Sequence, residues 1–195
     1  MKVIGLCGGS GAGKGTVCSI FNDFGIKNID TDKVYHSLIS TDSECTIELI
    51  SAFGNSIYSN PGIDRKALAN IVFSSPEKLN LLNKITHKHI LASVRRFISE
   101  CEDAPAVIVD APLLFESGFD KECDLTVCVI ADDDVRIKRI TARDCISVEK
   151  AKARINSQIP NSALIKKCNY AIENNSTESE LRTQIAQLYQ NLFNN

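Results

Sequence analysis

Short runs of consecutive apolar residues alternate along the chain with longer segments in which apolar residues recur at helical spacing. The runs predict five strands, at Lys2–Cys7, Ile26–Asp30, Ala106–Asp110, Leu125–Ile130 and Tyr170–Ile172. Strands that are apolar at nearly every position are typical of a parallel sheet covered on both faces. The pattern therefore predicts an α/β fold of three layers, in which a five-stranded parallel sheet lies between helices.

The interval between the second and third predicted strands contains helical patterns at Cys45–Phe53, Arg65–Phe73 and Pro76–Cys101. An interval of this length is too long for a plain crossover connection. We therefore predict a single domain whose core, residues 1–35 and 103–195, carries a helical insertion over about residues 36–102. We expect this insertion to cover the substrate.

Composition excludes several classes of function. The 195 residues carry a formal net charge of −2, which provides no general attraction to nucleic acid or to an acidic membrane surface. No apolar signal segment opens the chain, and no apolar run approaches the roughly 20 residues that span a bilayer. The eight cysteines are scattered without the spacing of a zinc site. We therefore expect a cytoplasmic protein with reduced thiols and no nucleic-acid or membrane partner.

The first predicted strand ends in a glycine-rich loop, Gly8-Gly9-Ser10-Gly11-Ala12-Gly13-Lys14, which precedes a predicted helix at Val17–Phe24. Gly8, four residues, Gly13 and Lys14 match the P-loop pattern in its strand–loop–helix context. Backbone N–H groups of such a loop form a nest for an anion, and the helix dipole favours negative charge there. A flexible turn with a surface lysine is the alternative, which the context disfavours. The residues predicted to bind ATP phosphates are Gly9, Gly11, Ala12, Gly13, Lys14, Gly15 and Thr16.

The residue after Lys14 is Gly15, where the P-loop pattern has a Ser or Thr whose hydroxyl binds Mg²⁺. Mg²⁺ would then be held through water, by Thr16, or by a carboxylate elsewhere. Asp110 closes the third predicted strand in the manner of a Walker B strand, which holds Mg²⁺ through water. We therefore expect Mg²⁺ to act with ATP, with Thr16 and Asp110 as candidate ligands.

The second predicted strand ends in Asp30-Thr31-Asp32. A carboxylate at this place can accept the proton of an attacking hydroxyl or orient Mg²⁺ through water. Asp and Thr are also good N-caps for a helix that we expect to start near Lys33. Asp32 is the candidate general base, whereas Asp30 either caps the helix or supports the base.

Arginines gather toward the C-terminal part of the chain, at Arg136, Arg139, Arg143 and Arg154. Arg139 and Arg143 are four residues apart and share one face of a helix, where two unpaired cations repel each other unless an anion binds. This spacing favours a lid that clamps phosphates. A solvated helix face is the alternative, because Asp132–Arg136 and Asp134–Lys138 are favourable pairs at the same spacing.

Three further features have both a functional and a structural interpretation. Asp64-Arg65-Lys66 could bind a phosphate-bearing substrate, or could open a helix with Asp64 as its cap. His87 lies on the long predicted helix, where a histidine more often packs than reacts. The segment at residues 111–116, an apolar stretch that ends in an acid, could line a substrate pocket, although core packing explains most of it equally well.

These segments occur in the order and spacing of dephospho-CoA kinases, which the chain resembles through almost its whole length. The most specific segments are Ile29-Asp30-Thr31-Asp32, Asp64-Arg65-Lys66-Ala67-Leu68 and Pro112-Leu113-Leu114-Phe115-Glu116. The resemblance implies transfer of the ATP γ-phosphoryl group to the ribose 3′-hydroxyl of dephospho-CoA, which yields coenzyme A and ADP. It also implies a P-loop kinase fold with a helical CoA-side insertion and a mobile lid at about residues 139–158.

The resemblance further implies which residues act. Asp32 would be the general base, and Lys14 and Arg139 would act on the transferring phosphate. Arg143 and Asn174 would contact ATP, with Asn174 near the adenine. The residues expected to contact dephospho-CoA are Asp32, Arg65, Lys66, His87, Leu113 and Phe115. The chain departs from the family pattern at Gly15, Thr31 and Lys88, and its oligomeric state is not implied.

Two other functions are consistent with the glycine-rich loop alone. A nucleoside monophosphate kinase is disfavoured by the Asp-x-Asp after the second strand and by the long helical insertion. A non-catalytic ATP-binding regulator is disfavoured because Asp32, Lys14 and the lid arginines occur together.

Overall fold

The computed structural model describes residues 1–193, and the chain divides into two compact units. The core unit comprises Met1–Ile29 and the chain from Cys101 onward, and the helical unit comprises Asp30–Glu100. The helical unit starts at the beginning of α2 (Thr31–Ile39), because α2 packs against other helices of this unit. The predicted insertion, residues 36–102, begins inside α2 instead.

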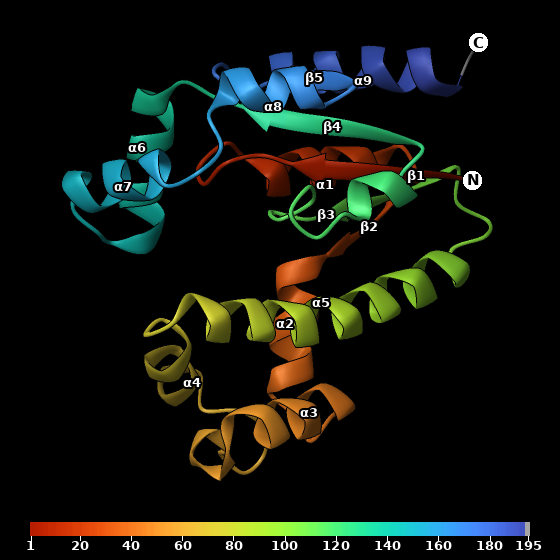
Figure 1. Cartoon of the computed structure of the whole chain (residues 1–195). Coiled ribbons are helices and arrows are strands. Elements are labelled where there is room, and N and C mark those ends of the chain that lie inside the picture. Colours follow the sequence, from red (N-terminus) through yellow and green to blue (C-terminus); the bar gives the residue numbers. More distant parts are fainter. Residues whose placement is uncertain (194–195) are drawn as a thin grey trace. The chain divides into compact units, whose positions relative to one another are not determined.

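The sheet has five strands in the order β2-β3-β1-β4-β5. The strands are β1 (Lys2–Cys7), β2 (Lys27–Asp30), β3 (Ala106–Asp110), β4 (Leu125–Ile130) and β5 (Tyr170–Glu173). β1 pairs in parallel with β3 and β4, and β4 pairs in parallel with β5 (Figure 1). The predicted α/β fold with a five-stranded parallel sheet is confirmed, with shifts of one residue at the start of β2 and at the end of β5.

Helices cover both faces of this sheet. On one face, Ile4, Leu6 and Ile108 pack into a core cluster with α1 (Lys14–Asp23) and α9 (Glu178–Phe193). On the other face lie α8 (Asn161–Lys167) and the connection after β3, which includes a 3-10 helix, Phe119–Glu122. The strands β1 and β3 are therefore largely buried between helices. Their carboxyl ends lie at the glycine-rich loop.

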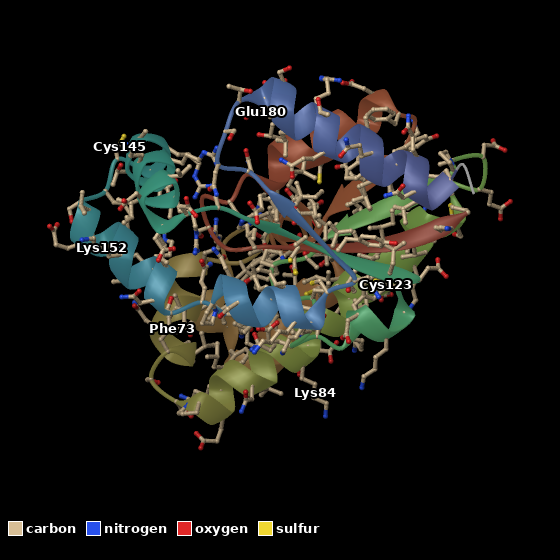
Figure 2. The ribbon with its side chains drawn as sticks, turned by 90° about the horizontal axis from the view of Figure 1, so that it is seen from above. Phe73, Lys84, Cys123, Cys145, Lys152 and Glu180 are labelled. Carbon is tan, nitrogen blue, oxygen red and sulfur yellow. The ribbon has the colours of Figure 1, made fainter. Side chains whose placement is uncertain are left out.

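Two helices after β4 form a pair with its own apolar contacts. They are α6 (Asp133–Asp144) and α7 (Val148–Asn156), and they pack through Ile140, Ala151 and Ile155. The α6–α7 pair extends from the carboxyl end of β4 (Figure 1). Cys145 forms the turn with φ 52° and lies at the outer end of the pair (Figure 2). The predicted lid, residues 139–158, falls on this pair.

The helical unit contains α2, α3 (Glu44–Phe53), α4 (Arg65–Val72), α5 (Pro76–Ser99) and a 3-10 helix, Asn55–Ile57. Its helices begin at side-chain caps: Ser43 caps α3 and Ser75 caps α5, which has proline in its first turn. The unit has its own apolar core of eight buried residues, including Ile39, Leu49 and Leu68. The predicted helices of this interval are present within a few residues of their expected ends.

Candidate active site

The glycine-rich loop connects the end of β1 to α1, and the helix begins directly from it. Gly13 is the residue before α1 and adopts φ 96°, ψ 30°, a left-handed conformation that a β-carbon disfavours. The Ala12 N–H donates to the Gly9 carbonyl oxygen at 3.1 Å across the loop. Since α1 starts three residues before the predicted helix, its positive dipole end lies at the loop itself.

Lys14 points back across the loop toward the neighbouring strand. Its Nζ donates to the Gly8 carbonyl oxygen at 3.3 Å and lies 3.7 Å from Oδ1 of Asp110, the last residue of β3. Both side chains are mostly buried, with 16% and 13% exposed. The fold therefore brings together the predicted phosphate-binding lysine and the predicted metal-binding carboxylate.

Arg139 and Asn174 contact the same loop from α6 and from the end of β5. Arg139 Nη1 donates to the Gly11 carbonyl oxygen at 3.3 Å, and Nη2 donates to Asn174 Oδ1 at 3.3 Å. Asn174, of which only 6% is exposed, donates from Nδ2 to the Ala12 carbonyl oxygen at 2.8 Å. These bonds hold a guanidinium group beside the predicted phosphate site.

Arg143 has a different partner from Arg139, although both lie on one face of α6. Its Nε and Nη2 donate to the Asp144 carboxylate at 2.7 and 3.0 Å, and Arg154 of α7 also bonds Asp144. These hydrogen bonds, first from Arg143 and then from Arg154, lower the pKa of Asp144 to about 2. The carboxylate thus joins α6 to α7 and balances charge that the sequence left unassigned.

Arg136 and Gln158 also contact the loop, and the sequence did not single out Gln158. Only 3% of Arg136 is exposed, and its Nη1 donates to Asp133 at 3.1 Å rather than pairing with Asp132 as the helical spacing suggested. Both side chains bind Ser10. No local pattern marks Gln158, because its partner lies 148 positions away in sequence.

Gly15 and Thr16 lie on the exposed first turn of α1. A β-carbon at Gly15 would have no atom within 4 Å, so a larger residue fits there. Among residues 1–193, no group of three or more His, Cys, Asp or Glu side chains could hold a metal ion. Any Mg²⁺ bound here would therefore take most of its ligands from phosphate and water.

Asp30 is the N-cap of α2: its Oδ1 accepts from the N–H groups of Asp32 and Lys33 at 3.0 and 3.1 Å. The sequence left open whether the carboxylates of this segment cap a helix or act in catalysis, and the capping role belongs to Asp30. The Asp32 side chain is exposed in the first turn of α2 and makes none of these capping bonds. Asp32 thus remains the candidate base of the helical unit.

The other predicted substrate residues of the helical unit lie on α4 and α5. Arg65 and Lys66 are exposed at the start of α4, which Asp64 caps through the N–H groups of Lys66 and Ala67. His87 is half-buried on α5. The predicted cap is thus present, and both basic side chains remain accessible to an anionic ligand.

Leu113 and Phe115 follow β3 in the core unit. Leu113 is 47% exposed, whereas Leu114 between them is fully buried in the core. Phe115 is half-buried, and Lys167 Nζ lies 4.9 Å from the centre of its ring, a cation–π contact. This segment therefore presents one apolar side chain outward while its neighbour packs inward.

Three cysteines meet below the loop, from β1, β4 and the end of α8. Cys7 and Cys128 are register partners on adjacent strands, and Cys168 Sγ lies 3.6 Å from Cys7 Sγ. Hydrogen bonds from Cys128 and Cys7 hold the pKa of the Cys168 thiol well below its usual range. None of the eight cysteines, all within residues 1–193, forms a disulfide.

Among the helices of residues 1–193, none has the length and hydropathy of a membrane span.

Comparison with known proteins matches residues 2–180 to the family model described as dephospho-CoA kinase. Curated dephospho-CoA kinases from Fusobacterium nucleatum and Chlorobaculum tepidum are 42% and 35% identical, covering 93% and 98% of this chain and 93% and 95% of the relatives. The crystal structure of TT1252 from Thermus thermophilus is similar with a TM-score of 0.83 and 30% identity, covering 97% of each chain. Shikimate kinase from Acinetobacter baumannii, at 16% identity and a TM-score of 0.56 over 100% of this chain and 94% of its own, shares the fold.

Proposed function

Because the chain belongs to the dephospho-CoA kinase family, we propose an assignment of the steps of that reaction to particular residues. The enzyme transfers a phosphoryl group from ATP to the ribose 3′-hydroxyl of dephospho-CoA, the last step of coenzyme A biosynthesis. One observation carries the assignment: Lys14, Asp110 and Arg139 lie around the glycine-rich loop. Phosphoryl transfer depends mainly on positioning and charge neutralisation, which such an arrangement supplies.

The loop and two cations bind ATP in this proposal. Backbone N–H groups at Gly9, Gly11, Gly13, Gly15 and Thr16 receive the phosphates, while Ala12 contributes by closing the loop through its N–H bond to the Gly9 carbonyl oxygen. The Lys14 ammonium is already held by Gly8 and Asp110, so little side-chain freedom is lost when it turns to a phosphate oxygen. Arg139 stands beside the loop to neutralise charge that develops on the transferring group.

The α6–α7 pair acts as a lid over the nucleotide. Its small separate core and the Asp144 link between its helices allow it to move as one body. Arg143 would reach ATP when the lid closes by exchanging one of its carboxylate bonds for a phosphate oxygen. Asn174 supports ATP binding beside Arg139, where its amide holds the Ala12 carbonyl oxygen. Closure would exclude water, so that the ribose hydroxyl reacts instead.

Asp32 is the general base that accepts the proton of the ribose 3′-hydroxyl. Its exposure and its freedom from the capping bonds of α2 leave the carboxylate accessible to an acceptor. Arg65 and Lys66 offer positive charge to the phosphates of dephospho-CoA. The remaining proposed contacts to this substrate are His87, Leu113 and Phe115.

Mg²⁺ fits the oxygen donors of the loop region. This ion usually keeps several waters and is held by one or two carboxylates together with substrate phosphates. Asp110 beside Lys14 and the exposed Thr16 hydroxyl are such donors, and we assign both as its protein ligands, directly or through water. When bound, the ion neutralises charge on the phosphates.

The acceptor is tested by ADP release from ATP and Mg²⁺ in the presence of dephospho-CoA, AMP, UMP or buffer alone. The expected result is turnover with dephospho-CoA only, with coenzyme A as its product. Turnover with AMP or UMP would assign another acceptor to the same loop. Tight ATP binding without turnover on any acceptor would indicate a non-catalytic regulator.

The base is tested by comparing Asp32→Asn with Asp30→Asn, two isosteric changes two residues apart. Removing a general base lowers kcat by about 10²–10⁴-fold, and ATP binding should stay nearly unchanged in Asp32→Asn. Asp30→Asn should retain most of the activity, because asparagine is as good an N-cap as aspartate. Near-normal kcat for Asp32→Asn, or equal losses for both variants, would exclude Asp32 as the base.

We also propose that the enzyme works in the cytoplasm without a nucleic-acid or membrane partner. The cysteines support a reducing compartment, because they are scattered without paired spacing and Cys7 and Cys128 are buried within apolar strands. Fractionation of the cells that make the protein, followed by assay of dephospho-CoA-dependent turnover in each fraction, tests this location.

A further inference from the structure

Arg136 is held in the core unit by three directed hydrogen bonds. It lies on α6 with 3% of its surface exposed, and its Nε donates to the Ser10 carbonyl oxygen at 2.9 Å. Nη2 donates to Gln158 Oε1 at 2.9 Å, and Nη1 donates to Asp133 at 3.1 Å. A buried guanidinium group is costly unless its N–H groups are bonded. These bonds therefore specify one position for the Arg136 side chain.

Ser10, in the glycine-rich loop, is bonded on every polar group. Its N–H donates to Gln158 Oε1 at 2.9 Å, while its carbonyl oxygen accepts from Arg136. Gln158 Nε2 and Ser10 Oγ lie 3.3 Å apart and form a third bond. A loop of this kind has no ladder of its own to fix its backbone, so side chains from elsewhere must do so. At Ser10 these side chains are Gln158 and Arg136, whereas Arg139 and Asn174 hold Gly11 and Ala12.

The loop is in direct contact with this pair. A β-carbon at Gly9 would lie 2.3 Å from Arg136 Nη2 and 3.0 Å from Gln158 Oε1, both shorter than ordinary contact distances. The absence of a side chain at Gly9 is therefore explained by Arg136 and Gln158, independently of any need to approach a phosphate. Arg136 and Gln158 therefore restrict which residue fits at Gly9, in addition to bonding Ser10.

The two residues also lie at the two roots of the α6–α7 pair, that is, at the start of α6 and just after the end of α7, where the chain enters and leaves the pair. Arg136 is in the first turn of α6, and Gln158 comes two residues after the end of α7. From this geometry we propose that Arg136 and Gln158 are positioning residues that hold Ser10, and with it the loop, in its phosphate-binding conformation and join the loop to both roots of the lid. This inference rests on the proposed nucleotide-binding function of the loop.

The expected effect is on nucleotide affinity. A loop already held in its binding conformation loses less backbone freedom when the phosphates arrive. Without the Gln158 bonds the loop is in that conformation for only part of the time, and apparent affinity falls in proportion to that fraction. At saturating ATP the phosphates themselves hold the loop, so kcat should change little.

The test compares Gln158→Leu with Gln158→Glu and with a matched control, Gln184→Leu. Gln184 likewise bonds both backbone groups of a single residue: Nε2 donates to the Glu173 carbonyl oxygen at 2.9 Å, and Oε1 accepts from the Glu173 N–H at 3.2 Å. Gln158→Glu keeps the oxygen that accepts from Ser10 and Arg136. Each variant is assayed for KM of ATP and kcat with dephospho-CoA, and for the Kd of Mg·ADP by calorimetry.

Gln158→Leu should raise the KM of ATP and the Kd of Mg·ADP about tenfold, as expected if the competent fraction falls to a tenth, with kcat within about twofold. Gln158→Glu should restore both constants to within about threefold, and Gln184→Leu should leave them unchanged. Wild-type affinity in Gln158→Leu, or equal weakening in Gln184→Leu, would refute the inference. If Gln158→Leu does not fold, weakened binding in the folded Gln158→Glu variant would refute it. Because ADP binding needs no acceptor, failure of the proposed function is seen separately, as absent turnover in the wild-type enzyme.

Discussion

Replacing Gly13 with alanine should destabilise the protein, whereas the same change at Gly15 should stabilise it. The two glycines are separated by one residue, but their surroundings differ. Gly13 has φ 96°, and a β-carbon there would lie 2.1 Å from Nδ2 of Asn174. At Gly15, inside the first turn of α1, a β-carbon would meet no atom within 4 Å.

The cost at Gly13 has two parts. A left-handed conformation costs a residue with a β-carbon about 1–2 kcal/mol. The Asn174 amide must also move away, and its bond to the Ala12 carbonyl oxygen at 2.8 Å is then lost. Leaving a buried polar group without a partner costs about 1–3 kcal/mol. Together these effects lower the free energy of unfolding by about 2–5 kcal/mol.

At Gly15 the change removes backbone freedom from the unfolded chain and improves helix propensity, which is worth about 0.5–1 kcal/mol. The two variants should therefore differ by about 2.5–6 kcal/mol in free energy of unfolding. Urea unfolding followed by far-UV circular dichroism measures this difference. If the two units unfold in separate transitions, the transition of the core unit is compared.

A double variant separates the two parts of the cost. In Asn174→Ala the amide is absent, so alanine at position 13 carries only the cost of its left-handed backbone conformation. Gly13→Ala should then cost about 1–2 kcal/mol on the Asn174→Ala background. Stability shifts of the same sign for Gly13→Ala and Gly15→Ala would contradict this difference between the two sites. An equal cost of Gly13→Ala with and without the amide would exclude the clash with Asn174 as part of that cost.

Three further outcomes are expected. Lys14→Met should lower kcat/KM at least about 100-fold, measured by ADP release, because one preorganised cation at the transferring phosphate is lost; a variant that melts like wild type but stays active would contradict this. Asp144 has a lowered pKa in the folded protein, so its ion pairs stabilise above the ordinary carboxyl pKa and this contribution is lost as pH falls toward 2. Asp144→Asn should therefore lower stability at pH 7, and urea unfolding should show the difference from wild type shrinking below about pH 4; a constant difference would exclude the ion pairs as its cause. Hydrogen bonds from its neighbours lower the pKa of Cys168, so the ratio of iodoacetamide labelling at Cys168 to that at the exposed Cys145 should rise as pH falls from 8 to 6. Peptide mass spectrometry measures this ratio, and a ratio that falls with pH would contradict a lowered pKa at Cys168.

Features that depend on residues close together in sequence were predictable. The strands follow from runs of apolar side chains, and three of the five have the expected bounds. The caps at Asp30 and Asp64 follow from a carboxylate placed two or three residues before the N–H groups that it accepts. Lys14 and the loop follow from a spacing that nests an anion. In each case the chemistry acts over a single turn, so the sequence contains it directly.

The partners of the loop were decided only by the tertiary structure. Ser10 and Gln158 are 148 positions apart, and Ala12 and Asn174 are 162 apart. A solvated face with an Asp132–Arg136 pair was the alternative that helical spacing offered, but Arg136 is buried and its guanidinium bonds the Ser10 carbonyl oxygen. Spacing along a helix describes which side chains share a face, but it does not say what that face packs against. Sequence alone thus determined the strands, the local caps and the phosphate-binding loop, while folding determined which distant side chains hold that loop in place, because a buried polar group takes whichever partner the packing brings within reach.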